Sequence, residues 1–159
     1  MSQFTLMKIL GYAGLVPFLV PVYLMGQAFF SAPGLQSAAI FGLYAPYVFI
    51  AYSAVILSFL SGTVWAYARH MEGGLSKGAI VVSNLLALSA WLSLLLIYVA
   101  PIMTLFALCL LMAGYLGLLV IERQLGVPQT PDYWRLRIQL SAVVSLANLL
   151  VILMMVAEL

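Results

Sequence analysis

Residues 79–121 read AIVVSNLLALSAWLSLLLIYVAPIMTLFALCLLMAGYLGLLVI and contain no Asp, Glu, Lys or Arg. A transmembrane helix needs about 20 consecutive apolar residues, because a helix rises about 1.5 Å per residue and the hydrocarbon core is about 30 Å thick. The stretch is therefore long enough for two spans. Pro101 interrupts it, and proline removes a backbone donor and clashes with the preceding turn. We expect a tight hairpin of two membrane-spanning helices, at residues 79–99 and 102–121.

The same test identifies three further spans, at residues 9–30, 46–68 and 138–157. Of the 159 residues, 66% are hydrophobic and 6% are charged, whereas a soluble domain carries about 25% charged residues. So few charges do not cover a surface in contact with water. We predict an all-α integral membrane protein, in which residues 1–159 form a single domain built as a bundle of five transmembrane helices. Pro17 and Pro21, in the first span, predict a kink in that helix.

The positions of the basic residues predict the orientation of the bundle in the membrane. With five spans the two termini face opposite sides, and the predicted spans place all six basic residues on one side: Lys8, Arg69, Lys77, Arg123, Arg135 and Arg137. Short cytoplasmic loops accumulate Lys and Arg, so we expect the N-terminus in the cytoplasm and the C-terminus on the opposite side. The membrane would be the bacterial inner (cytoplasmic) membrane, or the mitochondrial inner membrane in a eukaryote. A net charge of +2 does not indicate the basic surface of a nucleic-acid-binding protein, so no nucleic-acid partner is expected.

Small side chains recur at helical spacing in two of the spans. They are Ala54, Ser58, Gly62 and Ala66 in the second span, and Cys109, Ala113 and Gly117 in the fourth. Such a stripe lets another helix approach closely. We interpret both stripes as packing contacts between helices of the same chain, with a contact to a second chain as the alternative.

Asn84 and Asn148 are the most polar residues inside the predicted spans. They favour either hydrogen bonds between helices or a polar pocket for a lipid-soluble ligand such as a quinone. The first interpretation is preferred, since no ionisable residue lies at the same depth. Tyr52 and Trp91 also lie deep in spans, and we expect both to pack inside the bundle with their polar atoms bonded.

The segment from residue 130 to residue 137 opens the last helix. Thr130 is expected to cap it, Pro131 fits its first position, and Asp132 lies at the positive end of the helix dipole. The residues assigned to anchoring at the membrane interface are Asp132, Trp134, Arg135 and Arg137. The two arginines are expected to bind lipid phosphate or to pair with Glu122 and Asp132, which makes membrane lipid a predicted partner.

The sequence offers little for catalysis. His70 has no cysteine or carboxylate at metal-ligand spacing, so no metal site is predicted. Carboxylate pairs, a nucleophile beside a base and phosphate-binding loops are also missing from the sequence. We therefore expect no enzymatic activity and no bound cofactor.

Two functional hypotheses remain. The first is an accessory or assembly subunit that packs against a larger inner-membrane complex, with other inner-membrane proteins or copies of itself as partners. The alternative is a carrier or transporter for a small lipophilic molecule such as a quinone or a lipid. A central cavity lined by Asn84 and Asn148 would favour the carrier, and a filled bundle with an exposed groove of small residues would favour the accessory subunit.

Three stretches resemble an uncharacterised family of small membrane proteins: GYAGLVPF at residues 11–18, YSAVILSFLSGTVW at 52–65 and DYWRLR at 132–137. The family, domain of unknown function 3429, is found in proteobacteria and includes the mitochondrial transmembrane protein 69. The resemblance implies a five-helix inner-membrane protein of unestablished activity. It also implies a stretch similar to Gly-Gly-Val-His-Trp-Gly in the second span, where this chain has Val64 at the position of the histidine. A chemical role for that histidine is therefore not carried over.

Overall fold

The structure, a computed structural model, describes residues 3–31, 33–126 and 131–159. Its longer helices are α1 (Gln3–Ala13), α2 (Val16–Phe29), α3 (Ala45–Ala68), α4 (Gly74–Leu96), α5 (Met103–Gln124) and α6 (Pro131–Ala157). Between α2 and α3 lie the short helix η1 (Gly34–Ser37) and the strands β1 (Ala39–Ile40) and β2 (Leu43–Tyr44). When α1 and α2 are counted as one span, five helical segments are long and apolar enough to cross a membrane. The predicted helical membrane protein with five spans is confirmed.

The last helix begins at Pro131, as the sequence predicts. The apolar span predicted within it starts at residue 138, because the helix continues beyond the uncharged run into charged sequence. Pro131 occupies the first helical position, as its missing N–H allows. Thr130, the predicted cap, lies outside the described residues.

The first span is broken between α1 and α2. Pro17 lies in the first turn of α2 and has no N–H to offer to the preceding turn. The N–H of Phe18 donates to the carbonyl oxygen of Leu15 at 3.0 Å, and the carbonyl oxygen of Gly14 accepts instead from the hydroxyl of Tyr52 at 3.0 Å. The predicted kink is confirmed, and so is the prediction that the polar atom of Tyr52 is bonded to a neighbour.

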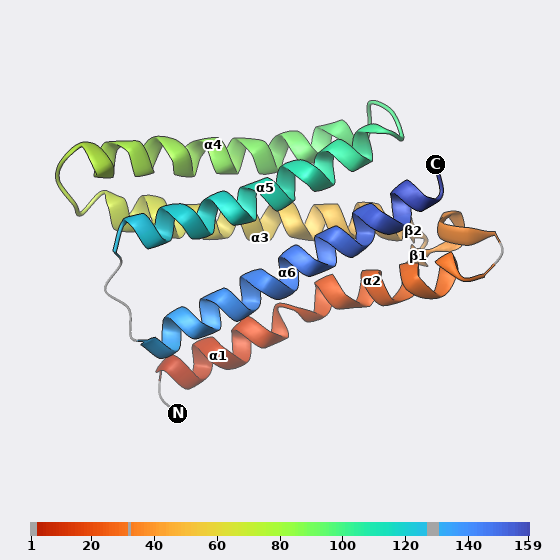
Figure 1. Cartoon of the computed structure of the whole chain (residues 1–159), viewed down its shortest axis with the longest axis horizontal. Coiled ribbons are helices and arrows are strands. Elements are labelled where there is room, and N and C mark those ends of the chain that lie inside the picture. Colours follow the sequence, from red (N-terminus) through yellow and green to blue (C-terminus); the bar gives the residue numbers. More distant parts are fainter. Residues whose placement is uncertain (1–2, 32, 127–130) are drawn as a thin grey trace. The chain divides into compact units, whose positions relative to one another are not determined.

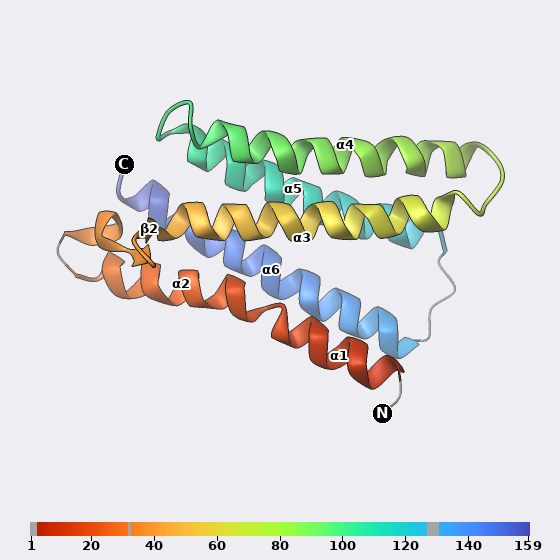
Figure 2. The same cartoon turned by 180° about the vertical axis from the view of Figure 1, so that it is seen from behind.

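The described residues form two compact units, and the division falls inside α3, between Tyr52 and Ser53. The first unit comprises residues 1–52 and 129–159. In it the broken helix α1–α2 runs beside α6 (Figures 1 and 2). The two helices approach closely at Gly11, where an added Cβ would lie 2.9 Å from Cδ1 of Leu140.

At the other end of the first unit, the C-terminus holds the connection between α2 and α3. The backbone N–H of Leu35 in η1 donates to Oε1 of Glu158 at 2.7 Å. Strands β1 and β2 then form an antiparallel hairpin, whose turn residues Phe41 and Gly42 have positive φ angles of 52° and 79°, as a two-residue hairpin turn requires. Burial, together with the nearby carboxylate of Glu158, raises the pKa of Tyr44.

The second unit, residues 53–128, contains the rest of α3 together with α4 and α5. The hydroxyl of Tyr115 in α5 donates to the carbonyl oxygen of Ser53 at 2.8 Å. The hydroxyl of Ser76 donates to the carbonyl oxygen of Ala68 at 2.7 Å, which ties the start of α4 to the end of α3. Both bonds are buried, so the helices of this unit are joined by polar contacts as well as by packing.

Candidate functional site

The small-residue stripe of α3 does not lie on the inward face of the helix. Ala54 is buried and Ser58 is half-buried, but Gly62 and Ala66 are exposed. Among the described residues, no heavy atom lies within 4 Å of a Cβ added at Gly62. The interpretation of this stripe as a contact within the chain is therefore wrong for Gly62 and Ala66.

The buried face of α3 is rotated by one residue from the predicted one. From Ser53 onward it follows Ser53, Leu57, Ser61, Val64 and Ala68, with Ala54 beside them; these five recur every three or four residues, as one side of a helix does. Val64 stands at the position of the histidine that the resemblance implies. That position belongs to the buried face, so a bulky polar side chain there would need a partner inside the protein.

The same rotation is found in α5. Cys109 and Ala113 are exposed, so the predicted packing contact is wrong for these two residues. Gly117 is half-buried and faces α4, where an added Cβ would lie 3.8 Å from Cδ2 of Leu86. The close contact is made by Gly114 instead. A Cβ added there would lie 2.5 Å from Cδ2 of Leu57 in α3. The search for small residues every four positions did not reveal it, because the residues four positions before and after Gly114 are Leu110 and Leu118. The small residue on the same buried face, Ala107, lies seven positions away.

The two asparagines lie in different units, Asn84 in residues 53–128 and Asn148 in residues 129–159. Asn84 is exposed, and its Nδ2 donates to the carbonyl oxygen of Ile80 in its own helix at 2.8 Å. Asn148 is 0% exposed, and its Nδ2 donates to the carbonyl oxygen of Val144 at 2.9 Å. Its Oδ1 is buried and has no hydrogen-bond partner among the described residues. Neither asparagine makes the predicted bond to another helix.

Trp91 is also placed differently from the prediction. Its side chain is 57% exposed on α4, although we expected it to pack inside the bundle. An aromatic ring on a lipid-facing surface needs no protein partner, since the hydrocarbon surrounds it as an apolar core would.

The anchoring residues divide into exposed and buried members. Asp132 and Arg135 are exposed and Trp134 is half-buried, all in the first turns of α6. Arg137 is only 7% exposed. The structure therefore does not present Arg137 to lipid headgroups as the anchoring prediction requires; the alternative, that Arg137 pairs with a carboxylate, stays a prediction.

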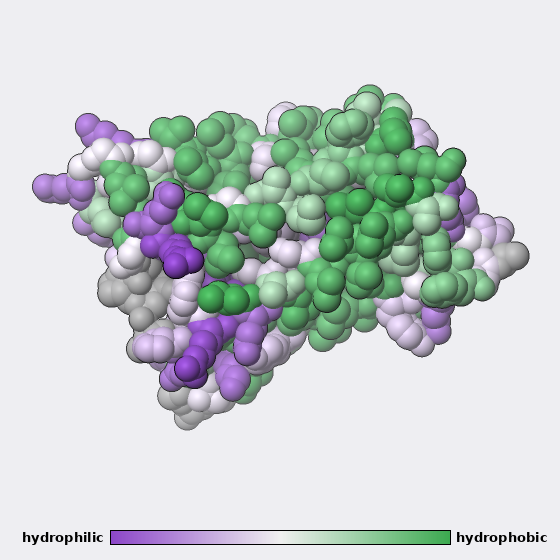
Figure 3. Space-filling model, viewed as in Figure 1, coloured by the Kyte–Doolittle hydropathy of each residue, from purple (hydrophilic) through white to green (hydrophobic). Residues whose placement is uncertain are grey.

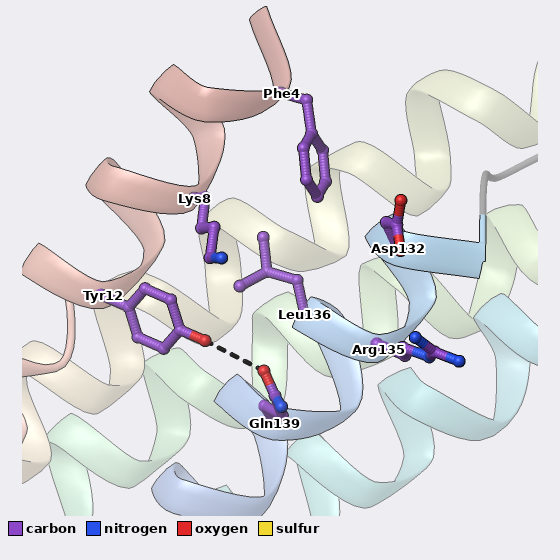
Figure 4. A pocket seen from close by; sticks show the side chains of 7 residues that line it. All are labelled: Phe4, Lys8, Tyr12, Asp132, Arg135, Leu136 and Gln139. Carbon is purple, nitrogen blue, oxygen red and sulfur yellow. Dashed lines mark hydrogen bonds between the residues drawn. The ribbon is translucent and has the colours of Figure 1, made fainter.

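A cavity of about 400 Å³ lies between α1 and the beginning of α6, within the first unit. Lys8, Asp132 and Arg135 contribute charged groups to its lining, and Phe4 and Leu136 contribute apolar surface. Figure 4 shows the amine of Lys8 pointing from α1 toward α6, with the ring of Phe4 above it. Charged and apolar side chains therefore border the same space.

One hydrogen bond crosses the base of this cavity. The hydroxyl of Tyr12 in α1 donates to Oε1 of Gln139 in α6 at 3.0 Å (Figure 4). Hydrophilic surface, drawn in purple, gathers at the end of the unit where α6 begins, and apolar surface follows along the helix (Figure 3). We name this feature the α1–α6 cavity.

The sequence analysis named Asp132 and Arg135 but not the rest of the cavity. A signal was present in the spacing, because Phe4, Lys8 and Tyr12 recur every four residues and so share one face of α1. On α6, Asp132, Leu136 and Gln139 lie four and then three residues apart, so they also share one face. That the two faces meet is information that only the tertiary structure supplies.

The lining of the α1–α6 cavity combines cations with apolar side chains. Among the described residues, no group of three or more His, Cys, Asp or Glu side chains is placed to hold a metal ion. The cations of Lys8 and Arg135 attract an anion, and the neighbouring apolar side chains accept hydrocarbon. The cavity is therefore matched to an amphipathic anion.

A family described as a protein of unknown function, DUF3429, matches residues 4–154. The match covers nearly the whole chain, so the chain belongs to this family. No curated protein and no solved structure matches it. The resemblance to a family of unknown function is thereby confirmed, and the link to mitochondrial transmembrane protein 69 stays an expectation.

Proposed function

We propose that this chain is a non-enzymatic accessory or assembly subunit, which packs against a larger protein complex in the bacterial inner membrane or the mitochondrial inner membrane. The observation that carries the proposal is the outer part of the α3 stripe, where Gly62 and Ala66 are exposed and Ser58 is half-buried. We name these three residues the α3 small-residue face.

If the α3 small-residue face contacts only lipid, its glycine lowers the stability of the helix without any compensating contact. Glycine lowers helix propensity by about 1 kcal/mol relative to alanine, and Gly62 lies in the middle of α3 without any neighbour within 4 Å of an added Cβ. Large apolar side chains, Val55 and Phe59, are exposed on the same helix. Small residues let the backbone of a second helix approach closely, which strengthens van der Waals packing inside the bilayer. A helix of another protein is the occupant that would make use of this surface.

The carrier hypothesis has less support. It needs a central cavity with Asn84 and Asn148 in its lining, but Asn84 is exposed and satisfied by its own helix. Asn148 is buried, with Nδ2 bonded to Val144. The exposed α3 small-residue face is the feature that the accessory role requires.

Replacing Gly62 with leucine tests the proposed role. The added side chain would keep a partner helix at a distance, so we expect the complex seen on native gels to shrink to the mass of the free protein. Crosslinking from residue 66, followed by mass spectrometry, would identify the partner in the unsubstituted protein. Thermal unfolding in detergent should be nearly unchanged, because the space at Gly62 is open.

Thr63→Leu is the control, since Thr63 is exposed on the same helix and points about 100° away from Gly62 around the helix axis, outside the α3 small-residue face. This variant should keep the complex. If Gly62→Leu also keeps it, the α3 small-residue face is not the contact. A crosslink between two copies of this chain would identify self-association, not an accessory role.

We also propose that the N-terminus lies in the cytoplasm, with the hairpin of β1 and β2 on the opposite side of the membrane. All six basic residues support this direction through the positive-inside rule. In a Cys109→Ser background, a membrane-impermeant maleimide should label Leu43→Cys in intact cells. It should label Glu72→Cys only after the membrane is opened. The reverse pattern would contradict the proposed direction.

A further inference from the structure

The α1–α6 cavity carries an excess of positive charge. Lys8 and Arg135 contribute two cations and Asp132 contributes one carboxylate, so the ionised groups of the lining sum to +1. The cavity lies at the end of the first unit at which α6 starts, close to where charged sequence gives way to the apolar run of residues 138–157. In a membrane protein this is the level of the lipid headgroups, where the negative charge of anionic lipids is found.

Apolar surface adjoins the charged groups. Phe4 and Leu136 line the cavity itself, and Ile9 and Leu10 are exposed on α1 immediately after Lys8. A free phosphate ion would gain nothing from this surface, because only hydrocarbon is stabilised by it. A lipid would use both parts, with its phosphate at the cations and its acyl chains along α1.

We propose that the α1–α6 cavity binds the phosphodiester headgroup of an anionic phospholipid. The amine of Lys8 points toward α6, whereas Figure 4 shows the guanidinium of Arg135 directed away from Lys8. On binding, the Arg135 side chain turns toward the cavity, so that both cations contact the phosphate oxygens through charge-assisted hydrogen bonds, which are stronger than neutral ones. The single negative charge of such a lipid balances the +1 of the lining. Zwitterionic phosphatidylcholine has no net charge and carries a bulky quaternary ammonium, so it matches the cavity less well.

Tyr12 and Gln139 have a positioning role in this site. Their hydrogen bond at 3.0 Å joins α1 to α6 beside the cavity, and the close approach at Gly11 joins the same two helices one residue before Tyr12. Together these contacts fix the distance between the helix that carries Lys8 and the helix that carries Arg135. The inference is independent of the accessory role proposed above, because it concerns another part of the chain.

The test uses the full-length protein in detergent, with phosphatidylglycerol, phosphatidylcholine or inorganic phosphate added separately. Native mass spectrometry would count bound lipids, and the rise in unfolding temperature would give the apparent affinity. We expect phosphatidylglycerol to bind in a one-to-one complex and to raise the unfolding temperature more than the other two additives. A double substitution, Lys8→Gln with Arg135→Gln, should weaken its binding by about tenfold or more, since two charge-assisted contacts are lost.

Lys77→Gln with Arg123→Gln is the matched control, because it removes the same charge from exposed positions outside the cavity. That variant should bind phosphatidylglycerol as the unsubstituted protein does. Asp132→Asn tests the opposite direction. It removes a negative charge from the lining, so phosphatidylglycerol should bind more tightly, whereas misfolding would only weaken binding.

Three outcomes would overturn the inference. The first is equal binding of phosphatidylglycerol by the Lys8 and Arg135 double variant and its control. The second is an equal temperature shift with phosphatidylcholine, which would show that the charge of the lipid does not matter. The third is a full shift with inorganic phosphate alone, which would identify a site for a soluble anion and not for a lipid.

Discussion

Gly114→Ala is expected to destabilise the unit of residues 53–128 by about 1 to 3 kcal/mol, the usual cost of overpacking a filled core. The new methyl group would lie 2.5 Å from Cδ2 of Leu57, and Leu57 is completely buried. Either the buried side chain of Leu57 has to repack or α3 and α5 have to move apart. Thermal unfolding in detergent, with circular dichroism as the readout, would measure the loss.

Gly117→Ala is the control, because the same change is made three residues later on the same helix. Its added Cβ would meet only Cδ2 of Leu86, at the ordinary contact distance of 3.8 Å. Here the gain in helix propensity, up to about 1 kcal/mol, should make the protein equally or more stable. Leu57→Ala should partly rescue Gly114→Ala in the double variant, as expected for residues in contact. Equal effects of the two glycine substitutions would contradict the close contact at Gly114.

Tyr52→Phe is expected to destabilise the first unit by about 1 to 2 kcal/mol. The hydroxyl of Tyr52 donates to the carbonyl oxygen of Gly14 at 3.0 Å, at the break where the N–H of Phe18 bonds to Leu15 instead. Water does not replace a lost donor within the hydrocarbon core, so the carbonyl would stay unsatisfied. The rings of Tyr52 and Phe18, 4.9 Å apart, would still pack. The effect therefore isolates the hydrogen bond.

Tyr23→Phe removes the same hydroxyl from an exposed position on α2, where it accepts a bond from Gln27 in its own helix at 2.7 Å. This control should change the unfolding temperature little. Hydrogen exchange at the amides of α1 and α2 adds a local readout, since loss of the Tyr52 bond should speed exchange around Gly14. Similar stability and exchange in both variants would show that Tyr52 does not hold the broken span together.

The faces through which α3 and α5 pack against other helices could not be predicted from the sequence. Small residues at a spacing of four indicated contacts at Gly62 and Ala113, but the packed surfaces of α3 and α5 lie one residue away, at Ser61 and Gly114. In a soluble helix the polar side marks the surface and so reveals the buried side. Both sides of a membrane helix are apolar, because lipid replaces water on the outside. The pattern therefore indicates that a close contact is available without indicating which contact is made.

The α1–α6 cavity could not be predicted from the sequence either, because its residues come from two helices far apart in the chain. Asp132 and Arg135 drew attention because they open the last helix, and Lys8 because it marks the predicted cytoplasmic side. Nothing in the sequence joins residue 8 to residue 135, since their distance along the chain carries no information about pairing between helices. The meeting of α1 with α6 places all three charges around one space.

The apolar run of residues 79–121, with its break at Pro101, determined by itself that the chain folds as membrane-spanning helices, since backbone groups in hydrocarbon must be bonded within the helix. The number of spans and the kink before Pro17 followed from the same rule and from the missing N–H of proline. The tertiary structure alone decided which faces are buried, that Tyr52 satisfies the break, and that Lys8 meets the start of α6. Helix formation depends on local sequence and on the surrounding solvent. The choice of partner depends on the shapes of side chains far apart in the chain.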